Sequence, residues 1–145
     1  MIDASVAVSV SIKEIETYIA AETALNSYTE KGSEFFAPNS IVAEVIFALC
    51  QKLSAGVLSE ARHETAITSF LDLMKNISTP DDERALIKRA VEIRASYGCS
   101  RSSDSLYIAL AEDLAKTRTV ELFTLDRGMI NQAAKNAPMV TVKVL

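Results

Sequence analysis

A ten-residue run at positions 41–50 constrains the fold more than any other stretch of the chain. Nine of its residues are apolar and the tenth is Glu44. The run follows Pro38-Asn39-Ser40, whose side chains suit a helix start, so it predicts a helix to about Ser54 that is apolar on every side and buried in the core. A buried carboxylate without a partner is strongly unfavourable. Glu44 therefore needs an arginine, a hydrogen-bond network or a bound cation.

The size and composition of the chain indicate a single globular domain, residues 1–145. Hydrophobic residues make up 49% of the sequence, which excludes intrinsic disorder. No apolar run is long enough to span a membrane, and no basic stretch precedes an apolar one at the N-terminus. We therefore expect a cytoplasmic protein without a membrane anchor. The net charge of −4 argues against a generic nucleic-acid coat protein, but not against an enzyme that reaches phosphate through metal ions.

The residue types present exclude several common kinds of active site. One histidine, His63, and two distant cysteines, Cys50 and Cys99, cannot form a typical zinc site. The cysteines are expected to be reduced core residues. Four scattered glycines form no phosphate-binding loop and no dinucleotide fingerprint. Any chemistry must therefore come mainly from carboxylates.

Strand and helix patterns alternate along the chain. Expected helices cover 12–28, 41–54, 59–75, 81–97, a stretch beginning near 104, and a short stretch after 128, whereas expected strands cover 1–3, 35–37, 76–79, 120–126 and 140–145. No hairpin turn signal joins neighbouring strands. This alternation predicts an α/β sandwich with a parallel sheet.

Four acidic side chains stand at positions where isolated charge is unfavourable. Asp3 and Asp126 end expected strands, Asp104 opens an apolar helix, and Glu44 lies inside another. Sites in open α/β sheets form beyond the carboxyl ends of strands, so the four are expected to meet there. Together they would repel one another unless a cation held them, and an all-oxygen set suits Mg²⁺ or Mn²⁺. Taken singly, a structural salt bridge for Glu44 and a helix cap for Asp104 remain open.

Four segments carry a resemblance to a known family. They are Asp3-Ala4-Ser5, Val42-Ala43-Glu44-Val45, Ser103-Asp104-Ser105-Leu106-Tyr107-Ile108-Ala109-Leu110-Ala111 and Thr124-Leu125-Asp126-Arg127. In this order and spacing the chain resembles the PIN domain family, and most of all its small single-domain members of the VapC type. The resemblance covers essentially the whole chain. Its most specific part is Asp-x-x-Tyr-x-x-Leu-Ala ahead of a strand that ends in Thr-x-Asp.

The resemblance implies a fold, an activity and a set of partners. The fold would be a PIN-like three-layer sandwich with a central, mainly parallel sheet flanked by helices. The activity would be that of a Mg²⁺- or Mn²⁺-dependent endoribonuclease that hydrolyses RNA phosphodiesters, often the toxin of a toxin–antitoxin pair and typically homodimeric. Carried onto matching positions, the metal-binding and catalytic residues would be Asp3, Glu44, Asp104 and Asp126, and the supporting hydroxyls would be Ser5 and Thr124. The first strand would have only two residues before Asp3, fewer than is usual in the family.

Further roles are assigned by position alone. Arg101 and Arg127 flank two of the acids and are candidates to bind the RNA backbone, the alternative being exposed charge or a salt bridge to the acids. Glu44 or Asp126 is the candidate to orient or deprotonate the attacking water.

Three rival functions make different demands on the sequence. A phosphoacceptor signalling domain would need an acidic pair after the first strand, whereas Asp81-Asp82 lies mid-chain beside a proline. A haloacid-dehalogenase-type phosphatase would need a second aspartate in the segment that here is Asp3-Ala4-Ser5. A non-catalytic protein-binding module on the PIN scaffold is the remaining alternative, and the complete set of four acids argues against it.

Overall fold

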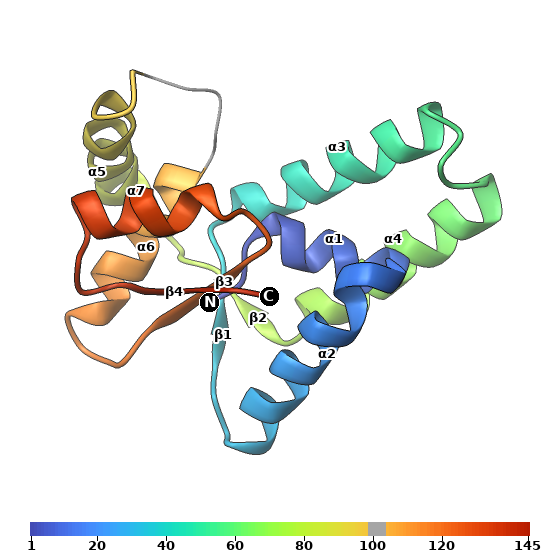
Figure 1. Ribbon diagram of the computed structural model, residues 1–145, viewed down its shortest axis with the longest axis horizontal. Coiled ribbons are helices and arrows are strands. Elements are labelled where there is room, and N and C mark those ends of the chain that lie inside the picture. The colour runs from blue at the N-terminus through green and yellow to red at the C-terminus, as the bar shows by residue number, and fades with distance from the viewer. Residues whose placement is uncertain (99–103) are drawn as a thin grey trace.

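The computed structural model describes residues 1–98 and 104–145 and shows a mainly helical molecule (Figure 1). Within the described residues there are seven helices and four short strands. In chain order these are α1 (Ala4–Ile12), α2 (Ile15–Glu30), β1 (Phe35–Phe36), α3 (Ser40–Ser54), α4 (Glu60–Met74), β2 (Ile77–Ser78), α5 (Arg84–Ala95), α6 (Asp104–Ala115), β3 (Glu121–Thr124), α7 (Gly128–Asn136) and β4 (Thr141–Val144).

The four strands form two separate parallel pairs. β1 pairs with β2 over two residues, and β3 pairs with β4 over four. The N-terminal segment lies between the pairs, since the Ile2 N–H donates to the Phe36 carbonyl (3.2 Å) and the Asp3 N–H donates to the Phe123 carbonyl (3.0 Å). The parallel direction agrees with the alternation of strands and helices in the sequence.

The expected three-layer sandwich with a central, mainly parallel sheet flanked by helices is wrong. The named strands form only two-stranded sheets, and helices provide most of the regular structure in the described residues. The cause lies in how early the extended segments end. The chain turns into a helix directly after Asp3, and Pro38, which has no N–H to donate, closes the segment that holds β1.

Helix α1 is the element that the sequence patterns did not predict. The Asp3 side chain caps it by accepting a hydrogen bond from the Val6 N–H (3.1 Å), which satisfies a free donor of the first turn. The helix is buried on several sides and packs against α2, α3 and α4. It ends at Lys13, which has a left-handed φ of 54°. The helix expected over 12–28 forms as α2, and the break at 13–14 separates it from α1.

Helix α3 forms where expected but is not buried on every side. Its inner face consists of Ile41, Val45 and Leu49, which are fully buried. On the opposite face an apolar stripe is exposed; it consists of Val42, Ala43, Ile46, Phe47 and Cys50. Phe47 is 63% exposed, and Cys50 is an exposed free thiol rather than the core residue expected from the sequence. Cys99 lies outside the described residues.

The helices lie on two sides of the short strands (Figure 1). Helices α1 to α4 are on one side, and α5, α6 and α7 are on the other. Both chain termini lie near the strands, between these helical parts. In the described ranges, no helix combines the length and the apolar character needed to cross a bilayer.

Candidate functional site

Asp3 is the centre of a buried hydrogen-bond network. The residue is 5% exposed, and its Oδ1 accepts hydrogen bonds from the Ser5 hydroxyl (2.6 Å) and the Val6 N–H (3.1 Å). Its Oδ2 accepts one from the Thr124 hydroxyl (2.5 Å). Ser5 lies in the first turn of α1, whereas Thr124 is the last residue of β3. The carboxylate therefore joins the start of a helix to the end of a strand.

The same two hydroxyls also position the backbone beyond β3. The Leu125 N–H donates to the Ser5 hydroxyl, and the Asp126 N–H donates to the Thr124 hydroxyl, each at 2.9 Å. Each hydroxyl thus donates to Asp3 and accepts from the chain that leads to Asp126. The family resemblance implied supporting roles for the Ser5 and Thr124 hydroxyls, and the structure places both against the Asp3 carboxylate.

The pKa of Asp3 is raised above its ordinary value. Burial is the main cause, because it disfavours the ionised carboxylate. Hydrogen bonds from Ser5, Thr124 and the Val6 N–H act in the opposite direction, and the negative charge of Asp104 raises the pKa further. Asp104 thus lies close enough to Asp3 for the two charges to interact.

Asp104 lies in the first turn of α6, and its Oδ2 accepts a hydrogen bond from the Gln132 side-chain amide (3.1 Å). Gln132 comes from α7, the helix that follows Asp126. The sequence patterns did not single out Gln132. A polar residue on the helix after the Thr-x-Asp strand is the signal that could have identified it.

Glu44 is linked to the same region because it interacts with the side chain of Tyr107. The tyrosine follows Asp104 by one turn of α6 and is 1% exposed. The pKa of its phenol is raised by burial, by the negative charges of Glu44 and Asp3, and by hydrogen bonding with Glu44. Its hydroxyl therefore lies within electrostatic range of two carboxylates from different elements. In the sequence, Tyr107 is marked only by its place in the Asp-x-x-Tyr-x-x-Leu-Ala motif.

Asp126 is placed differently from the other three acids. It is exposed, and its Oδ1 accepts a hydrogen bond from the Gly128 N–H (2.7 Å) at the start of α7. Its carboxylate is thus engaged with the helix start, although its backbone belongs to the Asp3 network. Arg127 is exposed beside it, and Arg101 lies outside the described residues.

The donor set fits a hard cation in chemical type, since it consists of carboxylate and hydroxyl oxygens. Asp3, Asp104 and Glu44 are linked electrostatically, directly or through Tyr107. Across residues 1–98 and 104–145, however, no three or more His, Cys, Asp or Glu side chains are grouped closely enough to hold a metal ion. The common point expected for all four carboxylates is therefore not formed in this arrangement of the side chains.

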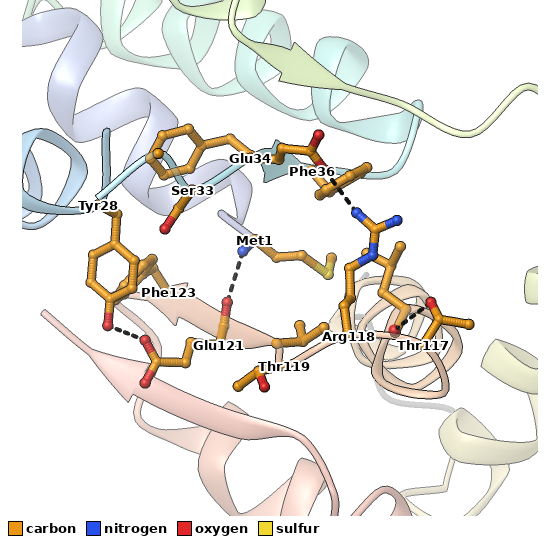
Figure 2. Close-up of a pocket in the computed structure, with 14 residues that line it drawn as sticks. Met1, Tyr28, Ser33, Glu34, Phe36, Thr117, Arg118, Thr119, Glu121 and Phe123 are labelled. Carbon is orange, nitrogen blue, oxygen red and sulfur yellow. Dashed lines mark hydrogen bonds and ion pairs between the residues drawn. The ribbon is translucent and has the colours of Figure 1, made fainter. Parts of the chain in front are cut away.

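A separate pocket of about 650 Å³ lies beside the start of β3 (Figure 2). Its lining includes Met1, Phe36 and Glu121. Charged side chains of the lining form ion pairs: Arg118 binds Glu34 (2.8 Å), and Glu121 binds Lys143 (2.8 Å). The acidic residues described above lie at the other end of β3, so this pocket is distinct from their site.

Comparison with known proteins adds no family assignment. No protein-family model matches the chain, and no curated protein matches it either.

Proposed function

We propose that this chain is a Mg²⁺- or Mn²⁺-dependent endoribonuclease that hydrolyses RNA phosphodiesters and acts as the toxin of a toxin–antitoxin pair. The observation that carries the proposal is the buried Asp3 carboxylate, which two hydroxyls hold at the end of β3 within electrostatic range of Asp104. The resemblance of the four acidic segments to the PIN domain family supports the same activity.

Each side chain has a role in this proposal. Asp3, Glu44 and Asp104 would hold the cation, and Ser5 and Thr124 would keep Asp3 in place. When bound, the ion would supply Lewis acidity at the scissile phosphate. Glu44 or Asp126 would orient the attacking water or accept its proton. The exposed guanidinium of Arg127 would bind the RNA backbone beside the acidic residues.

The test is cleavage of a fluorescently labelled single-stranded RNA library with Mg²⁺, with Mn²⁺ and with excess EDTA. We expect cleavage only with the metals, and a loss of roughly 100-fold or more in Asp104→Asn. Asp113→Asn is the matched control, because Asp113 is an exposed aspartate on the same helix that pairs with Lys116. Cleavage that persists in EDTA, or in Asp104→Asn, would contradict the proposal.

The metal-free protein provides a second readout for the same variant. Removing the charge of Asp104 removes one cause of the raised pKa of Asp3. We therefore expect Asp104→Asn to keep or raise the melting temperature without divalent ions while it abolishes cleavage. Clear destabilisation would instead indicate that Asp104 mainly caps α6.

An antitoxin is the proposed protein partner. It would cover the acidic residues and exclude RNA sterically, or insert an arginine that competes with the metal for the carboxylates. The test is addition of the neighbouring gene product to the cleavage reaction. Binding without loss of RNA cleavage would contradict this part of the proposal.

A homodimer is the proposed assembly, with the apolar stripe of α3 as its contact. The stripe is uncharged and lies along one helix face, so the same face of a second copy can cover it around a twofold axis.

A further inference from the structure

Tyr107 is a buried tyrosine close to two of the acidic residues. Its side chain is 1% exposed, and it follows Asp104 by three residues, so both side chains lie on the same side of α6. Its hydroxyl lies near Glu44 of α3 and near Asp3, which precedes α1. Tyr107 therefore interacts with carboxylates from two other parts of the chain.

The hydroxyl is what distinguishes Tyr107 from an ordinary core residue. A phenylalanine would fill almost the same space, whereas a buried hydroxyl is unfavourable unless it is hydrogen-bonded. The Tyr107 oxygen is shielded from solvent and makes no hydrogen bond of standard geometry within the described residues. Burial is the main cause of the raised pKa of the phenol; the charges of Glu44 and Asp3 and hydrogen bonding with Glu44 raise it further, while the backbone of Ala4 lowers it. A phenol is protonated at neutral pH, so the hydroxyl can donate to a carboxylate.

We propose that Tyr107 is a positioning residue of the acidic site, whose hydroxyl donates to the Glu44 carboxylate and holds it toward Asp3 and Asp104. This inference rests on the proposed metal-dependent function. A glutamate side chain has several rotatable bonds, so a fixed donor beneath it limits the orientations of the carboxylate. Removing a hydrogen-bond donor that orients a metal-binding side chain typically lowers metal affinity or activity by about 10–100-fold.

The experiment measures Mg²⁺ and Mn²⁺ binding to the full chain by isothermal titration calorimetry, without RNA. The variants are Tyr107→Phe, Glu44→Gln and the double variant, each checked for folding by circular dichroism and urea unfolding. We expect Tyr107→Phe to weaken binding about tenfold or more. In the Glu44→Gln background, the same change should have almost no further effect, since Tyr107 acts through Glu44.

Tyr18→Phe is the matched control. The Tyr18 hydroxyl also donates to a glutamate, Glu22, but within the exposed part of α2. Its loss should leave metal binding unchanged. A purely structural role for Tyr107 would lower the unfolding free energy of Tyr107→Phe without changing metal affinity.

The outcomes separate this inference from the proposed function. Tyr107→Phe that folds and binds metal like the wild type overturns the role of Tyr107, while RNA cleavage by the wild type would leave the ribonuclease proposal standing. If Tyr107→Phe lowers metal affinity equally in the wild-type and Glu44→Gln backgrounds, the role of Tyr107 is also overturned. A wild type that binds metal but cleaves no RNA refutes the ribonuclease and leaves the test of Tyr107 intact. A wild type that binds neither ion overturns both.

Discussion

The hydroxyl of Thr124 joins two parts of the acidic site that are far apart in sequence. It is fully buried, and it donates to Asp3 across 121 positions of sequence while it accepts from the Asp126 N–H. Because Thr124 is fully buried, water cannot replace its hydroxyl as a donor to the buried Asp3 carboxylate. One hydroxyl therefore stabilises both the Asp3 carboxylate and the turn after β3.

We predict that Thr124→Val lowers the unfolding free energy by about 1–3 kcal/mol, because it leaves the buried Asp3 carboxylate short of a donor and removes the acceptor of the Asp126 N–H. Urea unfolding at neutral pH measures the change. Thr65→Val is the control, since the Thr65 hydroxyl bonds the Ala61 carbonyl on an exposed face of α4. A loss below about 0.5 kcal/mol, the usual range for surface changes, would show that the Thr124 hydroxyl is dispensable.

At the scale of elements, the junction between α1 and α2 depends on one residue in an unfavourable conformation. Lys13 has a φ of 54°, and its N–H bonds the Ser9 carbonyl at the end of α1. This left-handed conformation costs a residue with a Cβ about 1–2 kcal/mol and costs glycine little. Lys13 adopts it where α1 and α2, which pack against each other, are joined.

Lys13→Gly should accordingly raise the unfolding free energy, by up to about 1 kcal/mol after the entropy of glycine in the unfolded chain is subtracted. Lys88→Gly tests the opposite sign, because Lys88 is exposed inside α5 and glycine there should cost about 1 kcal/mol. Thermal or urea unfolding distinguishes the two. Equal destabilisation by both changes would mean that the conformation of Lys13 is not strained.

A second link between elements is the polar cluster around Glu121 of β3. Its carboxylate accepts a hydrogen bond from Tyr28 of α2 and pairs with Lys143 of β4 (2.8 Å). Partial burial alone would raise the pKa of Glu121, but the bonds from Lys143 and Tyr28 and the charge of Lys143 outweigh it. The pKa is therefore held below its usual 4.5.

This direction of shift sets the sign of a pH effect. A lowered pKa in the folded state means that ionised Glu121 adds stability above about pH 4.5, and that this contribution is lost as the pH falls through the folded-state pKa. Glu121→Gln should thus be less stable than the wild type near pH 7, by at most about 1 kcal/mol because Lys143 is well exposed, and equal to it near pH 3. Glu64→Gln, an exposed change on α4, should show no such convergence. A constant difference across this pH range would contradict the coupling.

On the scale of the whole molecule, the outer face of α3 is the feature that bears most on assembly. The stripe of Val42, Ala43, Ile46, Phe47 and Cys50 faces solvent along the helix, although its sequence suggested burial inside one chain. A second copy would bury it without any change in the fold.

Phe47→Lys should shift the protein from dimer to monomer, because it places a charge at the centre of the proposed contact. Light scattering at tens of micromolar gives the mass, and circular dichroism verifies folding. Ile19→Lys is the matched control, since Ile19 is 68% exposed on α2, outside the stripe. A wild type that is strictly monomeric, or a Phe47→Lys variant that stays dimeric, would contradict the assembly.

Local sequence patterns determined the positions of most helices. The expected ranges 41–54 and 59–75 agree closely with α3 and α4, and 81–97 encloses α5. These patterns act over three or four residues through apolar spacing and caps, so a single sequence carries them. The Asp82 carboxylate illustrates this, because it accepts a hydrogen bond from the Arg84 N–H (2.9 Å) where a helix start was predicted.

Tertiary structure decided how far the sheets extend, which faces are exposed and which acids meet. Asp3 was predicted to end a strand but also starts α1, because its carboxylate can bond both the Val6 N–H and the Thr124 hydroxyl. The sequence identified Asp3, Glu44 and Asp104 by their unfavourable settings. Their neighbours Tyr107 and Gln132 depend on contacts between helices distant in the chain. Such contacts are set by the packing of the whole domain, and no local periodicity encodes them.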